Sequence, residues 1–267
     1  MRFKEPAYIL LSYTYIAFIG ISSAFLFAAA CVIRIVTWPF DRRLVILNLF
    51  SSFWASLYLW CMPLWSVKIQ GRNKMDMKKS YVVVSNHQSQ LDILVAYRLF
   101  FPFRWVSKAE VFKLPFIGWN MVLNGYVRLK RGDKQSVKQM MEQCEDLLSR
   151  NISVIIFPEG TRSKTGIVKP FKPGAFILAK KMKKPILPLV INNTKDALPK
   201  YSLVIRGRQK MQIKVLDEIP FSQFAHLEVE QIAQMVQKRI SSHVREHITI
   251  EQARTKRKPK YLENQFS

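Results

Sequence analysis

The sequence predicts an α/β fold in which a largely parallel sheet carries helices on both faces, preceded by an N-terminal membrane-embedded helical hairpin. Short β-branched apolar runs alternate with segments of helical periodicity between residues 70 and 250. Two long uncharged apolar runs come before this region, within residues 1–69. A basic tail, residues 251–267, completes the predicted division of the chain into a membrane anchor, an α/β domain and a tail.

The predicted anchor consists of the apolar runs Ala7–Ile33 and Leu44–Val67, neither of which contains a charged residue. Each run exceeds the roughly 20 residues that a helix needs to cross a bilayer. Basic residues flank both runs at both ends, which does not suit two spanning helices. We therefore expect a hairpin embedded in one leaflet from the cytoplasmic face, with spanning as the alternative. Asn48 and nearby serines would give its second helix a weakly polar side, and Trp60 and Trp65 would form an interfacial belt.

The net charge of the chain indicates which class of molecule it binds. Lys plus Arg number 42 and Asp plus Glu number 18, so the net charge is +24. Such an excess calls for an anionic partner. Because 49% of the residues are hydrophobic and 12% aromatic, anionic membrane lipids and phosphorylated substrates fit better than nucleic acid. We expect a membrane location, a catalytic domain on the cytoplasmic side and no nucleic-acid partner.

The α/β region is predicted from its alternating periodicities. Apolar residues recur at three- and four-residue intervals in the helical segments, whereas the strand segments are short and β-branched. Ligands of such sheets gather at the carboxyl ends of the strands. The predicted strands are Tyr81–Ser85, Phe103–Ser107, Gly125–Arg131, Ile152–Phe157, Pro185–Val190 and Met211–Val215, and the predicted helices are Ser89–Phe101, two short pieces within Val111–Asn124, Ser136–Arg150, Ala175–Lys181 and Leu227–His247.

A polar turn after the first of these strands contains His87, with Asp92 five residues later. In one regular helix, five residues would separate the two side chains by roughly 140° around the axis and about 7.5 Å along it. The stretch Ser89–Asp92 has the spacing of a capping box, so the helix should begin after His87 and hold Asp92 in its first turn. The carboxylate could then orient the imidazole as a general base. On spacing alone, a purely structural cap and turn are equally open.

Several motifs in one order resemble the glycerolipid acyltransferase family, in particular the 1-acylglycerol-3-phosphate acyltransferases. They are Asn86-His87-x4-Asp92, Gly125–Arg131, the heptapeptide Phe157–Ser163 and Pro188 within an apolar strand. The resemblance covers roughly Tyr81–Asn193. The second motif departs from the usual pattern, since Lys130 stands where an acidic residue is frequent and Arg128 where an apolar residue is usual.

The resemblance implies a reaction and its residues. His87, oriented by Asp92, would deprotonate the free hydroxyl of 1-acylglycerol-3-phosphate (lysophosphatidic acid), which would attack an acyl thioester and yield phosphatidic acid. The phosphate would bind Arg162, with Arg131 and Lys108 as further candidates. The acceptor pocket would be shaped by three residues of the heptapeptide, Glu159, Gly160 and Thr161.

No cofactor or metal is expected, because thioester alcoholysis requires none and no cluster of His, Cys and Asp has ligand spacing. The acyl donor could be acyl-CoA or acyl carrier protein, since positive charge favours both. Glycerol-3-phosphate or another lysophospholipid is the alternative acceptor. A non-catalytic, membrane-anchored protein that binds anionic lipids is the alternative of another class.

Overall fold

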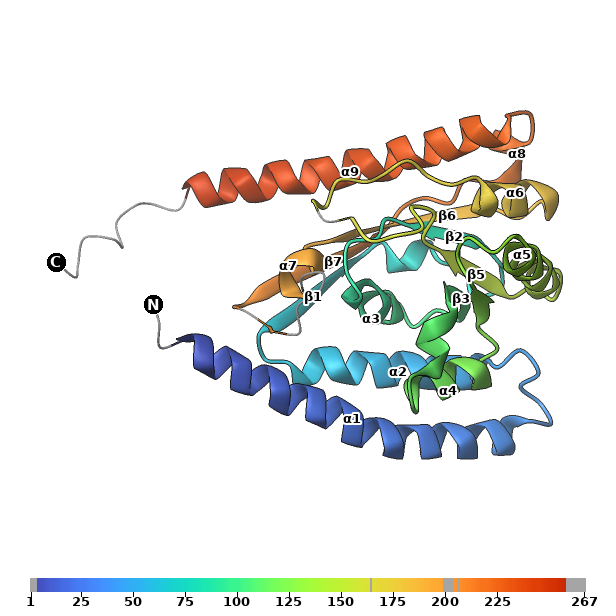
Figure 1. Cartoon of the computed structure of the whole chain (residues 1–267). Coiled ribbons are helices and arrows are strands. Elements are labelled where there is room, and N and C mark those ends of the chain that lie inside the picture. The colour runs from blue at the N-terminus through green and yellow to red at the C-terminus, as the bar shows by residue number, and fades with distance from the viewer. Residues whose placement is uncertain (1–3, 164, 199–203, 206, 258–267) are drawn as a thin grey trace.

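The computed structural model describes residues 4–163, 165–198, 204–205 and 207–257, and within them a seven-stranded sheet in the order β1-β7-β6-β2-β5-β3-β4 (Figure 1). The strands are β1 (Trp65–Gln70), β2 (Val82–Ser85), β3 (Phe103–Lys108), β4 (Val127–Leu129), β5 (Ser153–Ile156), β6 (Ile186–Asn192) and β7 (Gln209–Val215). Every pair in this sheet is parallel except β6 with β7. The predicted fold class is confirmed.

Helices cover both faces of the sheet (Figure 1). The helices are α1 (Lys4–Thr37), α2 (Val45–Cys61), α3 (Leu91–Tyr97), α4 (Ile117–Leu123), α5 (Lys134–Ser149), α6 (Gly174–Lys181), α7 (Thr194–Ala197), α8 (Phe221–Phe224) and α9 (Val229–Arg257), with 3-10 turns η1 (Arg72–Lys74) and η2 (Ala109–Lys113). Successive side chains of a strand point to opposite faces. Val83 of β2 accordingly packs in the core shared with α2 and α3, and Val82 and Val84 in the core shared with α5, α6 and α9.

The second apolar run, Leu44–Val67, is not one membrane helix, and the sequence-based interpretation was wrong here. α2 ends at Cys61, and the chain continues directly into β1, an edge strand parallel to β7. Pro63 follows the helix end and cannot continue a helical hydrogen-bond ladder. Trp65 is only 8% exposed at the start of β1, so of the two predicted interfacial tryptophans only Trp60, at 50% exposure, has an open surface.

The weakly polar side of α2 faces the protein interior. Asn48 is fully buried and donates from Nδ2 to the carbonyl of Phe103 at 3.0 Å and to the hydroxyl of Tyr126 at 3.1 Å. Ser51 is also buried and accepts from the side chains of Asn120 and Asn124. α2 therefore belongs to the packing of the α/β domain, and the boundary at residue 69 stays a prediction.

α1 is long and apolar enough to cross a bilayer, with a mean hydropathy of 2.4 and 11% of that window buried. Large apolar side chains along it point outward, among them Leu10, Phe25 and Ile35 at 67–74% exposure. At the other end of the chain, α9 continues to Arg257, and residues 258–267 of the predicted basic tail lie outside the described residues.

Candidate active site

His87 and Asp92 meet at the carboxyl end of β2. His87 lies in the loop after the strand, Asp92 lies in the first turn of α3, and His87 Nδ1 is 2.7 Å from Asp92 Oδ2. The predicted geometry of this pair is confirmed. The helix begins at Leu91, two residues after the predicted start at Ser89. In this turn the N–H of Ser89 donates to Asp92 Oδ2 at 3.0 Å, and the N–H of Leu91 donates to Ser89 Oγ at 3.3 Å.

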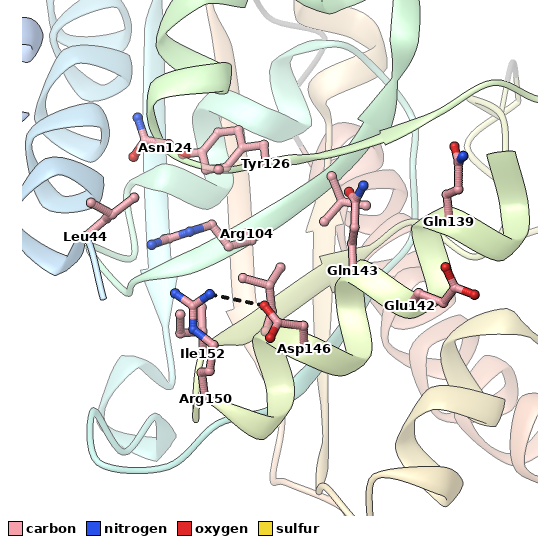
Figure 2. A pocket seen from close by; sticks show the side chains of 13 residues that line it. Leu44, Arg104, Asn124, Tyr126, Gln139, Glu142, Gln143, Asp146, Arg150 and Ile152 are labelled. Atoms are coloured by element: carbon pink, nitrogen blue, oxygen red, sulfur yellow. Dashed lines mark hydrogen bonds and ion pairs between the residues drawn. The ribbon is translucent and has the colours of Figure 1, made fainter. Parts of the chain in front are cut away.

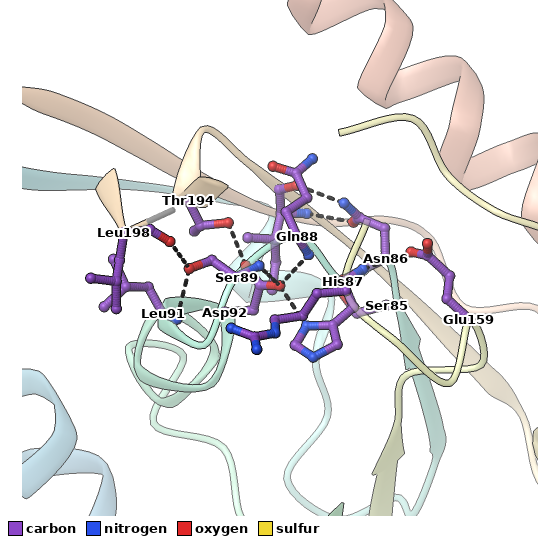
Figure 3. A network of polar contacts seen from close by, with 12 residues as sticks. Ser85, Asn86, His87, Gln88, Ser89, Leu91, Asp92, Glu159, Thr194 and Leu198 are labelled. Atoms are coloured by element: carbon purple, nitrogen blue, oxygen red, sulfur yellow. Dashed lines mark hydrogen bonds and ion pairs between the residues drawn. The ribbon is translucent and has the colours of Figure 1, made fainter. Parts of the chain in front are cut away.

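The carboxylate of Asp92 is fully buried and surrounded by donors (Figure 3). Its Oδ2 also accepts the backbone N–H groups of Gln88 at 2.6 Å and Ser89 at 3.0 Å. Its Oδ1 accepts the hydroxyl of Thr194, the first residue of α7. Nearby, Asn86 exchanges two hydrogen bonds with the backbone of Ile191 in β6. Sequence analysis missed Thr194 and the role of Asn86, because both depend on contacts between segments about a hundred residues apart.

The imidazole of His87 is stacked on an aromatic wall. Its ring lies 4.0 Å from that of Phe157 at an interplanar angle of 11°, and Phe157 lies 5.5 Å from Trp105. The side chain keeps 12% of its surface exposed. Among the described residues, no hydrogen bond engages Nε2, so the nitrogen opposite Asp92 is available for a substrate proton.

The Phe157–Ser163 segment wraps the backbone of His87. Glu159 accepts the N–H of His87 on Oε1 at 2.8 Å and the N–H of Lys169 on Oε2 at 3.1 Å. The N–H of Ser163 donates to the carbonyl of His87 at 2.8 Å. Gly160 adopts a φ of 67°, a conformation that favours glycine, as the turn after β5 closes. Two motifs that are distant in sequence therefore form one structural unit.

Burial gives Glu159 an unusual environment, since only 5% of the residue is exposed. Burial raises the pKa of the Glu159 carboxyl, while the backbone N–H groups of His87 and Lys169 and the charges of both residues act in the opposite direction. Because both carboxylate oxygens already accept backbone N–H groups, this side chain supports the turn. A direct contact of Glu159, Gly160 or Thr161 with the acceptor stays a prediction.

The predicted phosphate ligands all follow strands of the parallel part of the sheet, so they lie along the edge that holds His87. Arg162 follows β5, the neighbour of β2, and is half-buried. Among the described residues, no ion pair or hydrogen bond engages its guanidinium. Lys108 ends β3 and pairs with Glu110 at 3.2 Å. Arg131 is exposed beyond β4, three strand spacings or roughly 14 Å from β2.

A largely apolar cavity of about 220 Å³ lies between α1, α2, α3, α4 and β3. Its wall includes Trp105, which is separated from the imidazole of His87 only by the ring of Phe157. Ala55 of α2 and Leu94 of α3 also line it. Its volume exceeds that of apolar cavities that bind a benzene molecule, about 150 Å³.

A second and larger cleft, about 750 Å³, is lined by Arg104 and by residues of α5 (Figure 2). Arg104 and Val127, at the starts of β3 and β4, place it at the amino-terminal edge of the sheet, opposite the edge that holds His87. Arg104 of β3 lines it with 1% exposure, and burial lowers the pKa of its guanidinium. Its Nη2 donates to the carbonyl of Arg43 at 2.6 Å. Arg150 lines the cleft as well and pairs with Asp146 at 3.1 Å, so the charges there are mixed.

The residues of the described chain gather no group of three or more His, Cys, Asp and Glu side chains that could hold a metal ion. The candidate site contains an oriented imidazole, an aromatic wall, a guanidinium that has no partner among the described residues, and an apolar cavity. This combination suits proton abstraction next to an anionic, lipid-like substrate.

Comparisons with known proteins decide the family. A family model described as Acyltransferase matches residues 66–192. The uncharacterized acyltransferase C1851.02 of Schizosaccharomyces pombe is 30% identical over 207 residues, which cover 76% of this chain and 72% of that protein. The chain belongs to the acyltransferase family. The resemblance found in the motifs is thereby confirmed.

Two further comparisons identify similar proteins. The chloroplastic 1-acyl-sn-glycerol-3-phosphate acyltransferase BAT2 of Brassica napus is 38% identical over 162 residues, 60% of this chain and 46% of that protein. The acyltransferase spans about half the length of such curated relatives. The crystal structure of the 1-acyl-sn-glycerophosphate (LPA) acyltransferase PlsC from Thermotoga maritima shares the fold, with a TM-score of 0.72, 21% identity and coverage of 92% of this chain and 96% of that one.

Proposed function

We propose that this acyltransferase transfers an acyl chain from an acyl thioester to the free hydroxyl of 1-acylglycerol-3-phosphate, giving phosphatidic acid. The observation that carries the proposal is the 2.7 Å contact between His87 Nδ1 and Asp92 Oδ2 beside the Phe157–Ser163 segment. The name of the Brassica relative supports lysophosphatidic acid as the acceptor.

In the proposed mechanism, His87 is the general base. Asp92 holds Nδ1 in its protonated form, so Nε2 accepts the proton of the acceptor's hydroxyl. The oxygen attacks the thioester carbonyl, an ester C–O bond forms and the C–S bond breaks. The imidazolium then returns its proton to the departing thiolate. The donor is acyl-CoA or acyl carrier protein, and no cofactor takes part in these steps.

The acceptor's phosphate is proposed to bind Arg162. A half-buried guanidinium that has no partner among the described residues can offer a bidentate contact to phosphate oxygens. Arg131 and Lys108 stand further along the same edge and serve as additional phosphate contacts. The apolar cavity beside Trp105 is proposed to receive an acyl chain, because its wall lies one aromatic ring away from the base.

The acyltransferase is proposed to sit on the cytoplasmic face of a membrane, with α1 embedded in one leaflet and with anionic lipids as neighbours. Both ends of α1 are tied to the same domain. Near its start, the hydroxyl of Ser12 accepts the N–H of Ile205 at 2.8 Å. In the connector after it, Arg43 donates to the carbonyl of Asn151 and accepts from Arg104. A helix held along a domain at both ends lies beside that domain, which favours the one-leaflet arrangement over spanning.

The test is turnover by the purified full chain with a panel of acceptors, each offered with acyl-CoA and with acyl carrier protein as donor. The proposal expects phosphatidic acid from lysophosphatidic acid. Turnover of only glycerol-3-phosphate or of another lysophospholipid would contradict the acceptor, and no turnover with any pair would favour a non-catalytic lipid binder.

The assignment of His87 is tested on the same reaction. His87→Ala should lower kcat by about 10² to 10⁴, the range for loss of a general base. His243→Ala on α9 is the matched control, since the hydrogen bonds of the His243 ring among the described residues go to Arg239 and Ser242 of its own helix.

A further inference from the structure

The hydroxyl of Thr194 donates to Oδ1 of Asp92, the oxygen that does not face His87. Thr194 is the first residue of the short helix α7, which follows β6, and both Thr194 and Asp92 have no exposed surface. The residue lies 102 positions beyond Asp92 in the chain and outside the 66–192 segment that matches the family model. Its contact adds a third member to the His87–Asp92 pair (Figure 3).

The two carboxylate oxygens of Asp92 accept different numbers of hydrogen bonds. Oδ2 accepts from the imidazole of His87 and from the N–H groups of Gln88 and Ser89, whereas Oδ1 accepts only from Thr194 among the described residues. A buried carboxylate oxygen that lacks a hydrogen-bond donor is destabilising, because its lost hydration is not replaced. Without the Thr194 hydroxyl, the carboxylate could rotate so that Oδ1 accepts the hydrogen bonds that Oδ2 now accepts from His87, Gln88 and Ser89.

The position of Thr194 is itself held by contacts with the catalytic turn. Ser89 Oγ donates to the carbonyl of Leu198, directly after α7, at 2.8 Å. Asn86 is joined to Ile191 of β6 by bonds of 2.8 and 2.9 Å. The segment that carries the Thr194 hydroxyl is therefore fixed to the loop that carries His87 on both sides of the contact. A hydroxyl placed in this way restricts the rotation of the carboxylate.

We propose that Thr194 is a positioning residue of the acyl-transfer reaction: its hydroxyl fixes the rotation of the Asp92 carboxylate, so that Oδ2 keeps His87 Nδ1 protonated and Nε2 directed at the acceptor. This role rests on the proposed function of His87 as general base. It assigns Thr194 no contact with either substrate. Removal of the hydroxyl should therefore slow the chemical step and leave substrate binding unchanged.

The experiment compares Thr194→Val, Thr194→Ala and Thr194→Ser with the wild type. Valine and alanine remove the hydroxyl, and serine keeps it. Alanine places no added methyl group against the carboxylate, so it covers the case in which the valine variant does not fold. Thr37→Val is the matched control, because Thr37 is also buried and its hydroxyl donates only to the carbonyl of Ile33 within α1.

The expected result is a loss of kcat of about 10- to 100-fold in the valine or alanine variant, by analogy with hydrogen-bond partners that orient metal-ligating histidines. The KM values of both substrates should stay within about twofold of the wild type, and serine should restore most of kcat. Full kcat without the hydroxyl, or a serine variant as slow as alanine, would overturn the proposal.

A second readout does not require turnover. The chain contains 4 histidines, so the imidazole N–H of His87 can be identified by NMR after histidine labelling, using His87→Ala for assignment. The low-field Nδ1–H resonance should persist in wild type and Thr194→Ser and should broaden or move upfield in Thr194→Ala. An unchanged resonance in the alanine variant would refute the positioning role. An inert wild type with this expected pattern would refute the proposed function alone.

Discussion

The rings of His87 and Phe157 lie parallel at 4.0 Å, which joins the loop after β2 to the segment after β5 through a face-to-face contact. The backbone bonds from His87 to Glu159 and from Ser163 to His87 reinforce the same junction. The histidine motif and the Phe157–Ser163 motif are thus two sides of one site. A substitution in either motif should therefore alter the position of the His87 imidazole.

Arg162→Ala should raise the KM of the acceptor by about 10- to 100-fold, since a hydrogen bond to a charged group contributes roughly 1.5–3 kcal/mol. The KM of the donor should change much less. Steady-state kinetics with each substrate varied in turn measures both values. Arg150→Ala, at the opposite edge of the sheet, is the control. Equal effects on donor and acceptor would remove the assignment of Arg162 as phosphate ligand.

Glu159→Gln should reduce kcat, because an amide cannot accept on both sides: its NH₂ group would face the N–H of either His87 or Lys169. The displaced backbone would carry the imidazole away from its present position. Glu142→Gln on α5, where the carboxylate is 61% exposed, should leave kcat unchanged. A fully active Glu159→Gln variant would show that the two backbone bonds are dispensable.

The same substitution changes the pH dependence of stability. Burial raises the pKa of Glu159 above its ordinary value of 4.5. The folded protein then binds more protons than the unfolded chain above pH 4.5, so this contribution is complete below that pH and is lost as the pH rises through the folded pKa. Unfolding midpoints across this window should fall with pH in the wild type more than in Glu159→Gln. Parallel profiles would contradict the raised pKa.

Ala55→Phe should shift the donor preference towards shorter acyl chains. Ala55 lines the apolar cavity from α2, and a phenyl ring there would fill part of its 220 Å³. Competition between donors of different chain length measures the shift. Ala28→Phe on the exposed side of α1 is the matched control. An unchanged preference in Ala55→Phe would mean that the acyl chain lies elsewhere.

A cysteine in the connector between α1 and α2 should be protected from a membrane-impermeant thiol reagent in intact cells. Trp38→Cys is suitable because Trp38 is 65% exposed, in a background whose three native cysteines are replaced by serine. Gln135→Cys on α5 reports the catalytic domain. Both should react only after permeabilisation. Labelling of Trp38→Cys alone in intact cells would show that the hairpin spans the membrane.

Motif spacing predicted the strand, the histidine loop and the first turn of α3 because those features are set by residues close together in sequence. The spacing did not reveal Thr194, since a threonine a hundred residues away becomes a donor to Asp92 only when β6 pairs beside β2. It also did not reveal β1, because the first residues of the strand, Trp65 to Val67, belong to the end of the second uncharged run. For Glu159, the motif indicated that the residue lies at the site, but not that its carboxylate faces two backbone amides.

Only three residues, 62–64, separate the end of α2 from the start of β1. β1 is hydrogen-bonded along its length to β7, and β7 to β6, which pairs with the histidine strand β2. A tilt of α2 in the membrane would therefore also tilt the sheet. If α1 lies in a leaflet, docking of the protein fixes the depth of His87 in the membrane, and the proposed lipid substrate would reach it by lateral diffusion in two dimensions.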